Sequence, residues 1–130
     1  MNDEYSQWQR YADENLEMAR LALEHKYYNA CLQNVQQAVE KYLKAALLYN
    51  KSRFPKTHNI EMLSQQLTDL GIEPSISDEE AELLDTIYIP SKYPLGNALP
   101  DFVPDKEIGK QCLEIADRLK INISQIIQKN

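Results

Sequence analysis

The sequence predicts an all-α protein, an up-and-down bundle of four to five helices that forms a single domain over residues 1–130. Three observations predict it. Apolar residues recur every three or four positions along most of the chain, which is the spacing of one helix face. Only 3 glycines and scattered β-branched residues argue against a sheet. Proline-containing segments separate the periodic stretches, so the chain divides into helices joined by loops.

The central helix is expected over residues 27–50, the longest periodic stretch. At about 1.5 Å per residue it would span roughly 35 Å. Leucines widen its apolar stripe toward the C-terminal end, so several neighbouring helices must cover it. Glu40 and Lys44 lie on its narrow polar strip, four residues apart in the order that favours an ion pair on a helix face. The stripe consists of Tyr28, Cys31, Val35, Ala38, Val39, Tyr42, Ala46 and Tyr49.

The remaining helices are predicted from their start and stop signals. A first helix over residues 4–25 is joined to the central helix by a short link, which predicts antiparallel neighbours. A third helix over residues 60–70 is expected to begin after Thr57 as its N-cap and to end at Gly71.

Two further helices follow. Ser77 and Glu80 have the spacing of a capping box at the start of the fourth, which Pro90 and Pro94 are expected to break. Asp105 is the expected cap of the last helix.

The charges are unevenly distributed. The net charge of −6 argues against broad nucleic-acid binding. Residues 61–90 hold eight acids and no base, and residues 41–58 hold bases and no acid. This basic island can hold one phosphate group, or its lysines can simply stabilise the C-terminal end of a helix. The island consists of Lys41, Lys44, Lys51, Arg53 and Lys56.

Other classes of site find no support. The sequence has no phosphate-binding glycine loop and no cluster of metal ligands, so neither a metal nor a cofactor is expected. Cys31 and Cys112 lie on apolar stripes and are expected to be buried thiols. The absence of a signal peptide and of a long apolar segment predicts a cytoplasmic protein without a membrane span.

Three stretches together resemble the HEPN family of small helical bundles. QAVEKYLKA at residues 37–45 is similar to the Gln-Ala-x-Glu-Lys-x-x-Lys-Ala signature of the family's second helix. THNI at 57–60 is similar to its Thr-His-Asp-Leu element, with Asn59 in place of Asp. YIPSKYP at 88–94 is similar to its Tyr-x-Pro-x-Arg-Tyr-Pro element, with Lys92 in place of Arg.

The resemblance implies a function. Members are commonly homodimers, and many are encoded beside a minimal nucleotidyltransferase and are thought to bind nucleotides or to assist that partner. It therefore implies a nucleotide or another phosphate-bearing ligand, a nucleotidyltransferase partner and no catalysis by the chain itself. A separate branch consists of metal-independent ribonucleases, some of them toxins of toxin–antitoxin pairs, that use an Arg and a His four to six residues apart.

The expected ligand-binding residues lie on the matching motifs. Lys44, Lys92 and Tyr93 would converge on a phosphate if the segment after the fourth helix folds over the central one, and Glu40 would orient a lysine. An internal pair between Lys92 and Glu40 is the alternative. The ligand-binding set is Glu40, Lys41, Lys44, His58, Lys92 and Tyr93.

His58 is the best candidate for chemistry, because an imidazole titrates near neutrality. Arg53 and His58 have the spacing of the ribonuclease pair, so ribonuclease activity is the alternative function. They lie, however, in the loop that enters the third helix, where the family's ordinary Thr-His element belongs. The competing interpretation is a structural histidine that bonds a neighbouring helix through one ring nitrogen. The third alternative is a dimeric interaction scaffold.

Overall fold

The computed structural model describes residues 3–92 and 103–128, and the side chains of 88–92 and 128 lie outside this description. The described residues form five helices and no strand, which confirms the predicted all-α bundle. In chain order the helices are α1 (Glu4–Glu24), α2 (Tyr28–Tyr49), α3 (Ile60–Asp69), α4 (Asp78–Lys92) and α5 (Lys106–Gln128).

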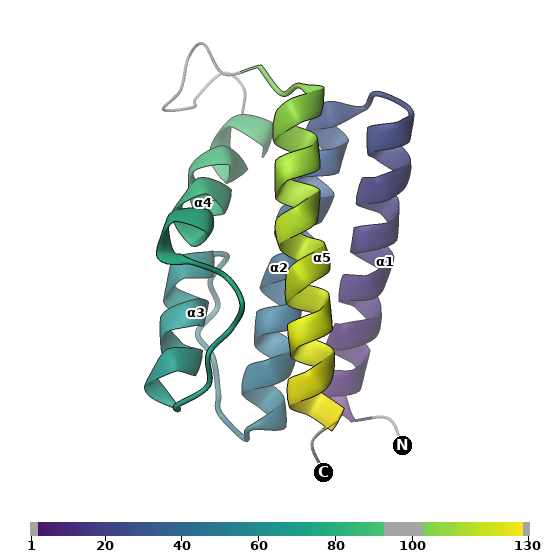
Figure 1. The fold of residues 1–130 in the computed structure, drawn as a ribbon. Coiled ribbons are helices and arrows are strands. Elements are labelled where there is room, and N and C mark those ends of the chain that lie inside the picture. The colour runs from purple at the N-terminus through teal and green to yellow at the C-terminus, as the bar shows by residue number, and fades with distance from the viewer. Residues whose placement is uncertain (1–2, 93–102, 129–130) are drawn as a thin grey trace.

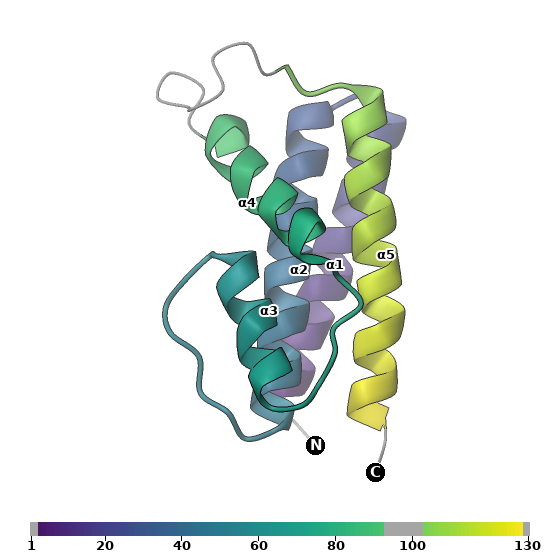
Figure 2. The same ribbon diagram turned by 60° about the vertical axis from the view of Figure 1, so that its left-hand side comes forward.

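The long helices α1, α2 and α5 lie side by side, and α3 and α4 cover the remaining side of α2 (Figure 1). As predicted, α1 and α2 are antiparallel neighbours, and α2 contacts every other helix. Figure 2 shows that residues 50–59 return along the outside of the bundle, so α3 runs in the same direction as α2. This returning loop brings the start of α3 beside the middle of α2.

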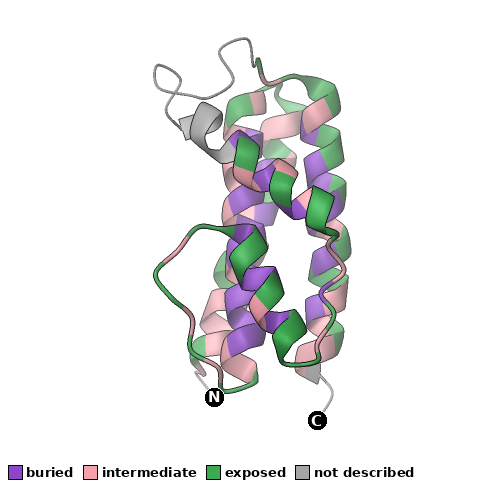
Figure 3. Cartoon of the chain, turned by 90° about the vertical axis from the view of Figure 1, so that its left-hand side faces the viewer, coloured by how far each residue is buried: buried purple, intermediate pink, exposed green. Residues whose placement is uncertain are grey.

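The core is built around α2, as the apolar stripe predicts. Figure 3 shows buried residues along the inward sides of the helices and exposed residues on the outer sides of α3 and α4. Tyr42 is fully buried, and its hydroxyl donates a hydrogen bond to Asp13 Oδ1 at 2.5 Å. Cys31 and Cys112 are also fully buried, and burial raises their pKa values to about 11 and about 12. None of the described helices is long and apolar enough to cross a bilayer.

The N-cap of α3 differs from the predicted one. Asn59, not Thr57, caps the helix, because Asn59 Oδ1 accepts a hydrogen bond from the Met62 amide at 2.7 Å. The Thr57 hydroxyl oxygen instead accepts a hydrogen bond from the Asn59 amide at 3.0 Å. The asparagine is two residues closer to the first helical residue, and asparagine is at least as good a cap as threonine.

A second helix also caps α3. Asp85 of α4 accepts hydrogen bonds from the amides of Ile60 and Glu61, at 2.7 and 3.1 Å. A carboxylate at this position satisfies two unpaired amides and lies at the positive end of the helix dipole. Asp85 therefore joins α4 to the start of α3.

The other predicted caps are confirmed. The Ser77 amide donates to Glu80 Oε1 at 2.9 Å, and the Glu80 amide donates to Ser77 Oγ at 3.1 Å, which is a complete capping box. The Ile108 amide donates to Asp105 Oδ1 at 2.9 Å at the start of α5.

The predicted break at Pro90 is wrong, since α4 continues to Lys92. A proline so close to the end of a helix removes one of its last hydrogen bonds and leaves the earlier turns intact. The predicted second break, at Pro94, lies outside the described residues.

Candidate functional site

The candidate site is centred on a buried carboxylate that has two basic partners. Glu40 Oε2 accepts a hydrogen bond from Lys44 Nζ at 2.7 Å, one turn along α2. Glu40 Oε1 lies 2.8 Å from Nδ1 of His58, which precedes α3. Only 5% of the Glu40 side chain and 8% of the Lys44 side chain are exposed, whereas 57% of the His58 side chain is exposed. We call Glu40, Lys44 and His58 the charged cluster.

The returning loop holds His58 in this position. Gln36 of α2 is fully buried, and its side-chain amide donates to the backbone carbonyl of His58 at 2.9 Å. At the other end of the loop, the Gln66 side chain donates to Ser52 Oγ at 3.1 Å and to the backbone carbonyl of Arg53. Both ends of the loop are therefore attached to helices.

Aromatic rings cover Lys44. Its ammonium nitrogen lies 5.5 Å from the ring centroid of Trp8 and 5.1 Å from that of Phe54. The two rings are 5.9 Å apart and nearly perpendicular. A cation near the faces of aromatic rings is electrostatically favoured, which helps to compensate for its lost hydration.

The cluster orients an imidazole. An ionised carboxylate can only accept hydrogen bonds, so the bond to Glu40 assigns a hydrogen to Nδ1 of His58. Glu40 thereby selects one orientation of a side chain that is more than half exposed. A histidine held in this way can donate or accept a proton at its other ring nitrogen.

The loop that carries the exposed histidine also carries exposed cations. Lys51, Arg53 and Lys56 are all exposed, and residues 41–58 contain no acid. We call residues 51–58 the basic loop. Its chemistry suits an anion in contact with solvent.

The comparisons with known proteins decide the family. The family model described as HEPN domain matches residues 5–122.

The chain belongs to the HEPN family.

Two solved structures are similar to this HEPN chain. TT1696 from Thermus thermophilus is 25% identical with a TM-score of 0.76, over 96% of this chain and 99% of that one. ST0689, described as an archaeal HEPN homologue, is 25% identical with a TM-score of 0.74, over 98% and 100% of the two chains. A search of curated proteins found no match.

The predicted ligand-binding residues of the HEPN chain do not all lie together. Glu40, Lys44 and His58 form the charged cluster. Lys41 faces α1, and its ammonium donates to Asn15 Oδ1 at 2.6 Å. A step of one residue turns a side chain about 100° around a helix, which accounts for this separation from Glu40. The Lys92 side chain and Tyr93 lie outside the described residues.

Three residues of the site were not predicted. Trp8 and Phe54 lie over the Lys44 ammonium, and Gln36 holds the backbone carbonyl of His58, but none of the three is part of a motif. Phe54 and Gln36 take part in the site because the returning loop crosses α2, and Trp8 reaches Lys44 because α1 packs against α2. The sequence signal for Phe54 is an apolar aromatic residue inside an otherwise basic loop.

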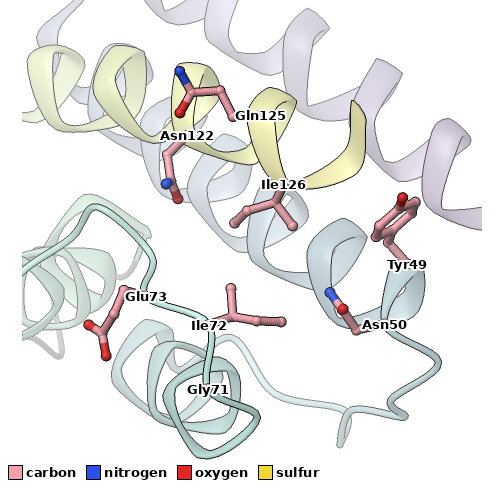
Figure 4. A pocket seen from close by; sticks show the side chains of 8 residues that line it. All are labelled: Tyr49, Asn50, Gly71, Ile72, Glu73, Asn122, Gln125 and Ile126. Carbon is pink, nitrogen blue, oxygen red and sulfur yellow. The ribbon is translucent and has the colours of Figure 1, made fainter. Parts of the chain in front are cut away.

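Elsewhere a cavity of about 460 Å³ lies between the C-terminal ends of α2 and α5 and the segment after α3 (Figure 4). Two of its amide side chains are used inside the protein. Asn50 donates to the Ala46 carbonyl at 2.8 Å, and Asn122 accepts a hydrogen bond from the Ser75 amide at 3.2 Å. We therefore assign no ligand to this cavity. Among the described residues, no group of three or more His, Cys, Asp or Glu side chains could hold a metal ion.

Proposed function

We propose that this HEPN chain binds a phosphate-bearing ligand, a nucleotide, at the exposed side of His58 and on the basic loop, without catalysis of its own. The observation that carries this proposal is the 2.8 Å contact between buried Glu40 and half-exposed His58, on a loop whose residues 51–58 include three exposed cations and no acid.

The buried residues of the charged cluster would support binding by holding His58 at the surface. When a phosphate approaches, Glu40 stabilises the protonated imidazole, which can then donate a hydrogen bond to the anion. Arg53 supplies a planar fork that suits phosphate oxygens. Lys44 remains covered by Trp8 and Phe54 and bonds to Glu40, so its role is to hold the carboxylate that positions His58 rather than to touch the ligand.

The proposed partner is a minimal nucleotidyltransferase. This proposal rests on family membership, since many members of the HEPN family are encoded beside such an enzyme. A nucleotide held on the basic loop is what such an enzyme would use or transfer. Co-purification of the tagged chain with the enzyme encoded beside it would support the pairing, and independent elution at micromolar concentration would contradict it.

Homodimerisation is also proposed. Large apolar side chains are exposed on one helix, with Tyr11 52%, Met18 49% and Leu21 44% exposed on α1. Exposed apolar groups of this size favour contact with another surface. Light scattering should give twice the chain mass, and Met18→Glu should reduce it to one chain mass.

The ligand proposal is tested with ATP in the absence of metal. Millimolar ATP should raise the melting temperature, and amide NMR shifts should cluster at residues 53–58. His58→Gln and Arg53→Gln should each weaken binding about fivefold or more, as expected for lost charge-assisted hydrogen bonds. Arg10→Gln, on the exposed surface of α1, is the matched control and should bind normally. An unchanged melting temperature in wild type would contradict the proposal.

One observation favours a second function, a metal-independent ribonuclease that uses His58 and Arg53. The Glu40–His58 contact is the arrangement that orients a general base through its Nδ1–H. Single-stranded RNA should then be cleaved in EDTA by wild type and not by His58→Ala. Intact RNA after incubation with wild type would rule out this activity.

A further inference from the structure

A shallow pocket lies on the surface of α1 near its N-terminal end. It has a volume of about 190 Å³ and is lined by Glu4, Gln7, Trp8 and Tyr11. These residues are spaced so that they share one face of the helix. The volume is below the roughly 300 Å³ at which pockets for whole small molecules begin, so the pocket suits a single ring system. We call it the α1 pocket.

Trp8 connects the α1 pocket to the basic loop. Its ring lines the pocket and also contacts the ring of Phe54 edge to face, with the two centroids 5.9 Å apart. Phe54 directly follows Arg53, one of the exposed cations of the basic loop. The pocket and the proposed phosphate site are therefore neighbouring parts of one surface, joined by the two rings.

The pocket offers an aromatic surface to solvent. Tyr11 is 52% exposed, and Trp8 is only half-buried although its ring contacts Phe54 and lies near Lys44. Accessible aromatic rings beside a positively charged surface are the arrangement on which nucleic-acid bases stack. Stacking tolerates every base, so the rings favour a flat heterocycle without selecting a particular one.

The polar side chains of the pocket can make that selection. Within the described residues, neither Glu4 nor Gln7 uses its side chain in a hydrogen bond or an ion pair. An ionised carboxylate can only accept hydrogen bonds, so Glu4 suits a base edge with adjacent donors. Guanine presents N1–H beside its amino group, whereas adenine and cytosine present an amino group beside an acceptor nitrogen. The amide of Gln7 can donate to the guanine carbonyl oxygen.

We propose that the α1 pocket binds the guanine base of a nucleotide whose phosphates lie on the basic loop. This inference rests on the proposed phosphate site and adds the identity of the ligand to it. The base would stack on Tyr11 and on the accessible part of Trp8. Glu4 would accept hydrogen bonds from N1–H and from the amino group of the base. Phe54 would lie between the base and the phosphates.

The experiment compares GTP, ATP and inorganic tripolyphosphate on the intact chain, by calorimetry without metal. Tripolyphosphate carries the charged groups without a base, and GTP should bind about tenfold more tightly than it does. Tyr11→Ala should remove most of this advantage and leave the affinity for tripolyphosphate unchanged. Intermolecular nuclear Overhauser effects between the guanine H8 proton and the ring protons of Tyr11 should locate the base.

The identity of the base is tested by the ratio of the GTP and ATP affinities. We expect GTP to bind about fivefold more tightly than ATP in wild type, and Glu4→Gln to bring this ratio close to one. The two nucleotides carry the same charge, so a general change in the charge of the protein cannot alter the ratio. Glu24→Gln, which removes an exposed acid at the other end of α1, is the matched control and should keep it.

The site should belong to a single chain. Tyr11 also lies at one end of the exposed apolar face of α1 on which homodimerisation is proposed, and Met18 lies two turns further along the helix, roughly 10 Å away. Met18→Glu should therefore retain the preference for GTP even as a monomer. Loss of the preference in this variant would contradict a base site formed by one chain. Circular dichroism melts of each variant show that the bundle remains folded.

Two results would overturn the base site and leave the phosphate site standing. One is equal affinity of wild type for GTP and tripolyphosphate, and the other is an equal loss of both affinities in Tyr11→Ala. Equal binding of GTP and ATP would overturn the assignment of guanine. Failure of the phosphate proposal gives a different result, because neither the nucleotides nor tripolyphosphate would then bind.

Discussion

Glu40 and His58 contact each other at 2.8 Å although they lie eighteen positions apart in the sequence, and one is almost fully buried while the other is more than half exposed. The pair thus connects the interior of the bundle to its basic loop. The buried carboxylate depends in turn on Lys44, which provides its second hydrogen bond. A substitution at any of the three residues should therefore change the interactions of the other two.

Glu40→Gln should destabilise the protein by about 3 kcal/mol or more, because it leaves the Lys44 ammonium buried without its counter-ion. Urea unfolding measures this change. Lys44→Met combined with Glu40→Gln should recover much of the loss, since the unpaired charge is then removed as well. Simple additivity of the two single changes would contradict the coupling.

Asp85→Ala should destabilise the start of α3 by about 1–2 kcal/mol, because two backbone amides lose their acceptor. Hydrogen exchange should become faster at Ile60 and Glu61 before it changes in α5. Asn59→Ala is the comparison, since it removes a different acceptor, that of the Met62 amide. Unchanged exchange at Ile60 would show that Asp85 does not stabilise this end.

Glu80 provides a test of pH dependence. The hydrogen bond from Arg118 is the largest cause that lowers the pKa of Glu80 from its ordinary value of 4.5. Because the pKa of Glu80 is lowered by folding, its ionised form stabilises the protein at pH values above the ordinary pKa. This stabilisation is lost as the pH falls through the folded-state pKa. Arg118→Gln should therefore lower stability by roughly 0.5 kcal/mol more at pH 7 than near pH 2, a value discounted because the pair is partly exposed. The hydrogen bond from Arg118 Nε to the Ser75 carbonyl, at 3.0 Å, is lost at both pH values.

Thermal melts at the two pH values measure this difference. Glu79→Gln is the control, because Glu79 lies in the same first turn of α4 and forms no ion pair within the described residues. A deficit of Arg118→Gln that stays equal from pH 7 to pH 2 would show that charge pairing with Glu80 is not its cause.

The two thiols should be inert in the folded protein. Burial raises the pKa values of Cys31 and Cys112 to about 11 and about 12, so neither forms a thiolate at pH 8. A thiol reagent should label both only in denaturant. Labelling of the native protein at the rate of a free thiol would indicate that α2 and α5 separate readily.

The sequence predicts the bundle because burial of apolar stripes governs helix packing, and local caps such as Ser77–Glu80 depend on residues only three apart. The site was predictable only in part. Glu40 and Lys44 are paired as their spacing indicates, yet the pair is buried rather than on an open helix face. Their burial depends on a loop that crosses α2, and no local pattern specifies such a path. The cap that Asp85 provides could not be predicted either, because Asp85 is far in sequence from the helix that it caps.

The aromatic cover of Lys44 also makes the site observable by optical spectroscopy. Trp8 is the single tryptophan of the chain, and its ring centroid lies 5.5 Å from the Lys44 ammonium. Indole emission depends on the electric field across the ring, so the tryptophan fluorescence of the unlabelled protein comes entirely from beside the buried ion pair. Any event on the basic loop that alters the contact between His58 and Glu40 should therefore shift the wavelength of maximum emission.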